Sequence, residues 1–303
     1  MRLWRWALLV VCRADLDGVS LLSRRCHEAL HFSLVQTSGE VNLTQMAPMM
    51  SLDTACKHHP GAVFDLYLYE KGGASVQPAV VAAMKKAGCT LRPRVVDEEI
   101  FEDTPLESFV RQKWKTILAG EHHVVQLSDL VRLVVLWRHG GWDLDTDVLV
   151  LKPLNELHDV VGKCDQELVN NAVLHFTRAS PFLSHLAKYV EEVYDPSIYA
   201  CLGPRLLTKA VEQWQKACGT QCLTVLKPNS FYPVRWEAAK SIFQLPISEE
   251  RMNGLLRDSY VLHAFNFAAK TQRASPGSIF HRVYRKNCVI CSVQVSKADL
   301  KSM

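Results

Sequence analysis

Three carboxylates spaced two residues apart, Asp143, Asp145 and Asp147, stand in the segment GGWDLDTDVLVLKPL, between a glycine pair and an apolar run. If residues 142–151 form an extended strand, all three side chains lie on one face of it. Carboxylates this close repel one another, so the spacing indicates a site for a cation.

Two kinds of cation site can begin with alternating aspartates. An EF-hand calcium loop requires glycine at its sixth position and glutamate at its twelfth, and this chain has Val148 and Leu154 there. A magnesium or manganese site needs only one or two carboxylates, because waters and substrate phosphates complete it. In a sugar-nucleotide reaction such a cation neutralises the leaving diphosphate. A solvated acidic turn is the remaining alternative, but it does not explain why the acids lead into a β-branched core strand.

A helix is expected to deliver the chain to these acids. In LSDLVRLVVLWRHGG, Ser128 is a good N-cap and Gly140 with Gly141 ends the helix. Asp129 and Arg132 are three residues apart, which places both on one helix face. They are read either as an ion pair on a core helix or as part of the carboxylate site that follows.

Strands alternate with helices in the first part of the chain. Apolar runs at 31–37, 63–69 and 91–96 read as strands, and the segments 46–59 and 78–87 read as helices. This alternation predicts an α/β fold with a largely parallel central sheet flanked by helices.

Composition excludes some classes of protein. The chain has 303 residues, 48% hydrophobic and 22% charged, which is typical of a soluble globular protein. Its net charge of +4 comes from 35 basic and 31 acidic residues scattered along the sequence. No basic stripe for nucleic acid is present, so no nucleic-acid partner is expected.

The ten cysteines fit a reduced chain, a zinc site or disulfides, and we favour disulfides. Cys288 and Cys291 have the spacing of half a zinc ribbon, but no second pair matches them. The paired histidines His58 and His59 are expected at the surface, because adjacent side chains diverge.

The N-terminal segment 1–29 reads as a short remnant of a signal anchor. Its uninterrupted apolar run, residues 6–12, has seven residues, whereas a span needs about 20. Asn42 opens a glycosylation sequon, which is weakly consistent with a lumenal chain.

The motif order resembles a known family. LSDLVRLVVLWRHGGWDLDTDVLVLKPL is similar to the D-x-D glycosyltransferases with the sugar-binding region motif, in which S-D-x-x-R, a helix, G-G and L-D-x-D-x-x-x-L-K-P-L follow in this order. FEDTPLESF at 101–109 and the downstream segments at 202–214, 229–236 and 258–266 resemble the group of lactosylceramide 4-alpha-galactosyltransferase and alpha-1,4-N-acetylglucosaminyltransferase. The resemblance covers roughly residues 30–290.

This resemblance implies a GT-A-type nucleotide-sugar-binding fold with one catalytic domain. Its nucleotide-sugar half would be residues 30–160 and its acceptor-side half residues 161–303. It also implies a UDP-sugar donor, Mn²⁺ or another divalent cation, and a location on the lumenal face of the Golgi. The family's N-terminal membrane anchor is not convincingly present here.

Site residues carry over from the family motifs. Asp145 and Asp147 form the D-x-D pair that holds metal, ribose and diphosphate, and His263 would complete the metal site. Asp129 and Arg132 would contact the donor sugar, with Asp129 counted among the catalytic residues. Further donor contacts are expected from Thr37, at the end of the first strand, and from the pair Asn170 and Asn171, of which Asn170 is the assigned donor-binding residue; a local turn is the alternative for the pair.

Two departures from the family pattern stand out. Asp143 occupies a place where relatives have an aromatic residue. Residues 47–55, APMMSLDTA, replace an R-Q-x-C-x-x-E-S-A helix, so an expected arginine and an expected cysteine are missing. A family disulfide and one ligand contact are therefore in doubt.

The sequence as a whole predicts a retaining glycosyltransferase. It would move a hexose, galactose or N-acetylhexosamine, from UDP to a glycolipid or glycoprotein glycan in alpha linkage, most closely like an alpha-1,4-galactosyltransferase. The alternative is a catalytically impaired pseudotransferase that binds UDP-sugar or glycan.

Overall fold

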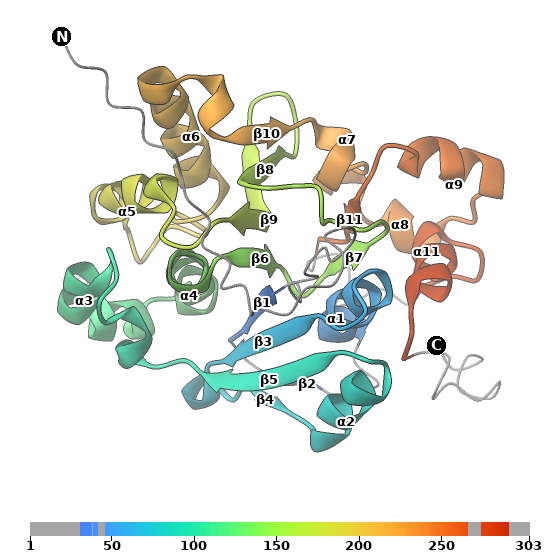
Figure 1. Ribbon diagram of the computed structural model, residues 1–303, viewed down its shortest axis with the longest axis horizontal. Coiled ribbons are helices and arrows are strands. Elements are labelled where there is room, and N and C mark those ends of the chain that lie inside the picture. The colour runs from blue at the N-terminus through green and yellow to red at the C-terminus, as the bar shows by residue number, and fades with distance from the viewer. Residues whose placement is uncertain (1–30, 38, 42–45, 266–273, 291–303) are drawn as a thin grey trace, which may run out of the picture.

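The computed structural model describes residues 31–37, 39–41, 46–265 and 274–290. A seven-stranded sheet crosses its centre, with helices on both faces (Figure 1). The strands are, in spatial order, β10 (Thr224–Leu226), β8 (Val160–Lys163), β9 (Val169–Phe176), β6 (Gly141–Leu144), β1 (His31–Gln36), β3 (Val63–Leu68) and β5 (Thr90–Val95).

The sheet is mostly parallel, which confirms the expected α/β class. The pairs β1–β3, β3–β5, β1–β6 and β8–β10 are parallel, whereas β9 runs antiparallel to β6 and β8. The three strands predicted in the first part of the chain are present, each displaced by one residue at most.

Helices cover the two faces of the sheet separately. One face carries α3 (Glu107–Ala119), α4 (His123–His139), α5 (Pro181–Val193) and α6 (Pro204–Cys218), and the other carries α1 (Met46–His58) and α2 (Pro78–Lys86). Alternation along β3 feeds both cores, since Phe64 and Leu66 pack on the α1 side and Tyr67 on the α4 side.

A second, smaller unit lies beside the sheet. The antiparallel ribbon of β7 (Val148–Val150) and β11 (Val261–His263) packs with α8 (Ser241–Gln244), α9 (Glu249–Leu256) and α11 (Ile279–Asn287) in its own apolar cluster. The remaining elements are α7 (Pro228–Phe231), the pair β2 (Glu40–Val41) and β4 (Ser75–Val76), and 3-10 turns at Glu70–Gly72, Glu98–Phe101, Thr220–Cys222 and Trp236–Ala238.

Two predictions of secondary structure are wrong. Ser128 is not an N-cap, because α4 already begins at His123 and Gln126 and Leu127 are buried within it. Residues 142–151 are not one strand either. A turn at Thr146–Asp147 separates β6 from β7, so the three aspartates do not share a face.

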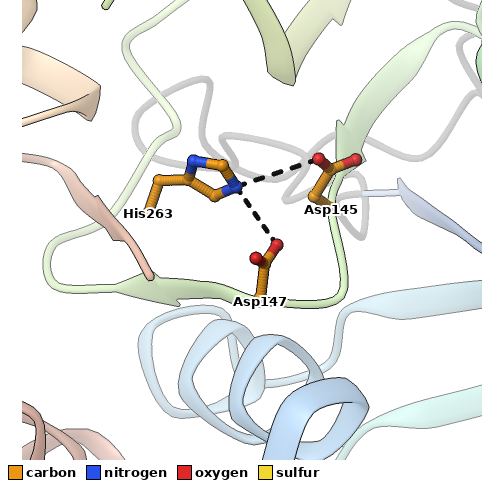
Figure 2. A group of neighbouring side chains, drawn as sticks. All are labelled: Asp145, Asp147 and His263. Carbon is orange, nitrogen blue, oxygen red and sulfur yellow. Dashed lines mark hydrogen bonds and ion pairs between the residues drawn. The ribbon is translucent and has the colours of Figure 1, made fainter. Parts of the chain in front are cut away.

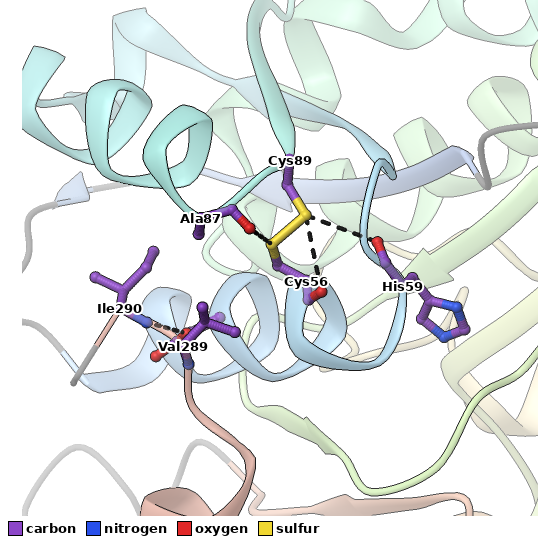
Figure 3. Close-up of a disulfide and its surroundings, with 7 residues drawn as sticks. Cys56, His59, Ala87, Cys89, Val289 and Ile290 are labelled. Atoms are coloured by element: carbon purple, nitrogen blue, oxygen red, sulfur yellow. Dashed lines mark hydrogen bonds between the residues drawn. A yellow bond between two sulfur atoms is a disulfide. The ribbon is translucent and has the colours of Figure 1, made fainter. Parts of the chain in front are cut away.

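Disulfides are confirmed at Cys56 and Cys89, which link α1 to the start of β5 (Figure 3). Cys288 is disulfide-bonded as well. The prediction for His59 is wrong, since its ring is 5% exposed, lies 5.2 Å from the Phe32 ring and accepts a hydrogen bond from the Leu154 backbone. Burial lowers the pKa of His59 to about 4.

Residues 1–29, with the expected anchor remnant, and the sequon at Asn42 lie outside the described residues. Within the described ranges, no helix combines the length and the apolar character that crossing a bilayer demands.

Candidate metal and donor site

Asp145, Asp147 and His263 converge at the end of the β7–β11 ribbon (Figure 2). His263 Nε2 lies 3.1 Å from Asp147 Oδ1 and 3.9 Å from Asp145 Oδ2. One ligand atom from each residue falls within 4.8 Å of the others. Asp147 and His263 are 116 positions apart in sequence, so only the pairing of β7 with β11 brings the three together.

The turn that carries both acids is held from several sides. Gly140 has a φ of +68°, and a Cβ there would come 2.7 Å from the Arg178 backbone nitrogen, so glycine is required where α4 gives way to β6. Asp145 N donates to Ala172 O at 2.8 Å, and Ala264 N donates to Asp147 O at 2.9 Å. The turn is thus tied to β9 on one side and to β11 on the other.

Arg132 forms a second cluster with three carboxylates. Its Nη1 donates to Asp143 Oδ2 at 3.0 Å, its Nη2 donates to Asp145 Oδ1, and its Nε lies 3.7 Å from Asp129 Oδ1. The Arg132 side chain is 6% exposed. Asp143 also accepts from Ser33 Oγ of β1 at 3.0 Å. The acid that departs from the family pattern is therefore a buried partner of the arginine.

Burial sets the protonation of this cluster. Burial raises the pKa of Asp129 and that of Asp143 to about 6, with Arg132 opposing the rise in both. Burial disfavours the charged form of Arg132, but the surrounding carboxylates outweigh it and raise the Arg132 pKa. Burial lowers the pKa of His263, but the Asp147 and Asp145 carboxylates raise it by more than burial lowers it. The net shift of the His263 pKa is therefore upward.

The donor set fits a divalent cation. When ionised, Asp129, Asp143, Asp145 and Asp147 carry four negative charges, against one positive charge on Arg132 among these groups. Two carboxylates and an imidazole that meet at one point, beside this excess of negative charge, suit a cation that accepts both oxygen and nitrogen ligands. Asp145 has a side chain 32% exposed, so this point is open to solvent and to a ligand.

The other predicted donor-binding residues lie around the point where Asp145, Asp147 and His263 meet, and they differ in whether they contact the site residues. Asn171, next to Asp129 in space, donates from Nδ2 to Asp129 Oδ1 at 2.8 Å. Asn170 accepts from Ala172 N at 2.9 Å and from Tyr232 Oη at 3.2 Å. Thr37 follows β1, at the carboxyl edge where α/β sheets bind ligands. No hydrogen bond among the described residues joins Thr37 to residues 145–147, which we call the acid turn.

Two groups support the site, and one of them, Ser51, has no counterpart among the residues predicted from the sequence. The asparagine pair at 170 and 171 resembles a donor contact in the sequence, and the structure shows that Asn171 is the one that contacts Asp129 and accepts from Arg132 through its backbone oxygen. Ser51 of α1 touches the acid turn through its hydroxyl. The sequence signal was a hydroxyl residue beside Met49, Met50 and Leu52, because a hydroxyl that is buried with such residues needs a partner, and the structure buries Ser51 completely.

Two family models match this chain. Residues 49–162 match the glycosyltransferase sugar-binding region containing the DXD motif, and residues 175–295 match the alpha 1,4-glycosyltransferase conserved region. The first match contains Asp129, Arg132, Asp145 and Asp147, and the second contains His263.

Curated relatives agree with these models. The lactosylceramide 4-alpha-galactosyltransferase of Pongo pygmaeus is 31% identical over 203 residues, which cover 63% of this chain and 89% of that protein. The mouse enzyme of the same name is 34% identical over 56% of this chain and 48% of its own length. Human alpha-1,4-N-acetylglucosaminyltransferase is 27% identical over 63% of this chain and 57% of its own length. The chain therefore spans about half the length of several relatives it matches.

Proposed function

We propose that this chain, which belongs to the DXD-containing alpha-1,4-glycosyltransferase family, is a metal-dependent hexosyltransferase. The donor would be a UDP-sugar carrying galactose or an N-acetylhexosamine. The acceptor would be a glycolipid or glycoprotein glycan, and transfer would retain configuration to give an alpha linkage. The convergence of Asp145, Asp147 and His263 carries this proposal.

In this proposal Asp145, Asp147 and His263 hold Mn²⁺ or another divalent cation, which supplies positive charge beside the leaving diphosphate. Arg132 fixes the orientation of Asp145 through its Nη2. Asp129 presents a second oxygen, Oδ2, that has no hydrogen-bond partner among the described residues and lies beside Gly203. A donor-sugar hydroxyl would satisfy this oxygen, because a buried acceptor without a partner is costly.

A location on the lumenal face of the Golgi is part of the same proposal. The buried Cys56–Cys89 disulfide supports an oxidising compartment, where such bonds persist. Expression of a tagged chain in cells, followed by fractionation and protease protection, is expected to place it inside Golgi vesicles.

The full chain, incubated with UDP-galactose, UDP-N-acetylgalactosamine and UDP-N-acetylglucosamine in Mn²⁺ or EDTA, tests the activity. We expect UDP release with one donor, stimulated by a galactose-terminated glycan and abolished by EDTA. NMR of the product is expected to show an alpha linkage. Binding of a UDP-sugar without metal-dependent UDP release under any of these conditions would instead identify a pseudotransferase.

A further inference from the structure

Helix α1 lies along the edge of β7 that faces away from β11, in the position that a third strand of the ribbon would occupy. Leu151 N donates to Tyr260 O at 2.8 Å, towards the β11 side. The alternate amides of β7 point the other way, as amides of a strand do. Val148 N donates to Ser51 Oγ and Val150 N donates to Thr54 Oγ1, both at 2.9 Å. Two hydroxyls of α1 therefore satisfy the strand edge that β11 leaves open.

The two hydroxyls differ in what else they touch. Ser51 Oγ lies 2.7 Å from Asp145 O and 2.8 Å from Val148 O, so its single proton is shared between carbonyls on either side of the acid turn. Thr54 Oγ1 donates back to Met50 O within its own helix at 2.6 Å. Both side chains are fully buried. Only Ser51 bridges the start and the end of the segment that carries Asp145 and Asp147.

We propose that Ser51 is a positioning residue for the metal site: its hydroxyl fixes the span of the turn between Asp145 and Val148, and with it the separation of the two carboxylates. This inference rests on the metal site of the proposed function. Without the hydroxyl, Val148 N keeps only a 3.3 Å contact to Asp145 O, and the turn can widen. Two carboxylates must stay at a fixed separation to share one ion, because magnesium and manganese demand near-octahedral geometry.

Asp145 has a partly exposed side chain, so burial alone does not hold it in place. Its backbone is held by Ala172 and Ser51 and its carboxylate by Arg132. Arg132 fixes the direction of one carboxylate, whereas Ser51 fixes the distance between two.

Calorimetric titration of the metal-free full chain with Mn²⁺ tests the proposal, with the melting temperature measured in parallel. Ser51→Ala removes the bridging hydroxyl, and Thr54→Val removes the other hydroxyl at nearly constant volume. We expect both variants to lose a similar amount of melting temperature. Mn²⁺ affinity is expected to fall about 10-fold in Ser51→Ala, the low end for residues that orient metal ligands, and to stay within about 2-fold in Thr54→Val. Ser51→Thr, which keeps a hydroxyl, is expected to bind Mn²⁺ as the wild type does.

Three outcomes count against the inference. Equal Mn²⁺ affinity in Ser51→Ala and wild type, or an equal loss in Ser51→Ala and Thr54→Val, would overturn the positioning role while leaving the metal site intact. If Ser51→Ala does not fold, Ser51→Cys, similar in size with a weak S–H donor, takes its place in the same comparison. A wild-type chain that binds no Mn²⁺ would overturn the metal site itself and the inference with it.

Discussion

Two carboxylate clusters share Asp145 but are neutralised in different ways. On one side, Asp129, Asp143 and Asp145 surround Arg132, a guanidinium built into α4. On the other side, Asp145 and Asp147 face His263, whose charge depends on pH. The first cluster contains a permanent cation, the Arg132 guanidinium. In the second cluster the positive charge can change, because it comes from a histidine that titrates or from a bound ion.

This difference separates stability from binding. Arg132, Asp129 and Asp143 are buried, and the guanidinium offsets part of the carboxylate charge before any ligand arrives. The His263 cluster shares Arg132 through Asp145, and it gains further positive charge when the His263 imidazole is protonated or a cation binds. We therefore expect substitutions on the arginine side to change folding, and substitutions on the histidine side to change metal affinity.

Arg132→Met should have the largest effect. It leaves Asp129, Asp143 and Asp145 close together without their guanidinium, and breaking a buried ion pair costs about 3–5 kcal/mol. Chemical denaturation is expected to show a loss of this size, partly recovered in Arg132→Lys, which keeps the charge without the fork. A stable Arg132→Met protein would contradict the first half of the comparison.

Asp147→Asn should act on the other cluster. It removes one ligand while lessening the repulsion between carboxylates, so the melting temperature of the metal-free protein is expected to change little. Mn²⁺ affinity should fall by about 100-fold or more, beyond the range for changes in supporting residues, and UDP release should be abolished. Retained metal-dependent turnover would refute the assignment of Asp147 as a ligand.

Asp143→Asn is the matched change on the arginine side. The amide oxygen can still accept from Ser33, but Arg132 loses a charged partner that is 1% exposed. A loss of about 1.5–3 kcal/mol is expected, the range for hydrogen bonds to charged groups, with Mn²⁺ affinity unchanged. If Asp143→Asn weakened Mn²⁺ binding as much as Asp147→Asn does, the two clusters would have to be treated as one.

The smallest effect concerns pH. The His263 pKa is raised in the folded, metal-free protein, so the protonated form adds stability fully below the unfolded value of about 6.5. That stability is lost as pH rises through the higher folded pKa. Metal binding needs a neutral imidazole and should show the opposite trend, weakening as pH falls through the same range. Mn²⁺ titrations from acid to neutral pH should show this slope in wild type and a shallower one in His263→Gln.

Much of this arrangement could be read from local sequence. The glycine pair, the core strand after the acids and the order of strands and helices follow from residue periodicity and turn chemistry. Local spacing indicates a cation site among the three acids, and the family resemblance selects Asp145 and Asp147 as its pair. The place of His263 came from family resemblance instead, because no local pattern links residues 116 apart.

Other features depend on packing that a single segment does not encode. The sequence assigns no role to Asp143; only the packing of α4 on β1 and β6 supplies one, by turning Arg132 towards it. Ser128 has the residue type of an N-cap, but the buried turn before it extends the helix. The alternation of acids suggests one strand, yet the turn at Thr146–Asp147 sends the chain from the main sheet to the ribbon.

Helix α1 also bears on how the chain folds. Besides Ser51 and Thr54, it carries Asp53, fully buried, whose Oδ1 accepts from Val289 N at 2.6 Å and from Ile290 N at 2.7 Å. These contacts span sequence separations from 94 to 237 residues. A contact between residues this far apart forms only after a long loop has closed. The chain loses conformational entropy in closing the loop before the contact stabilises it, which slows folding. During synthesis, α1 emerges long before the amides that complete it, so we expect the helix beside the acid turn to be among the last parts of the molecule to become native.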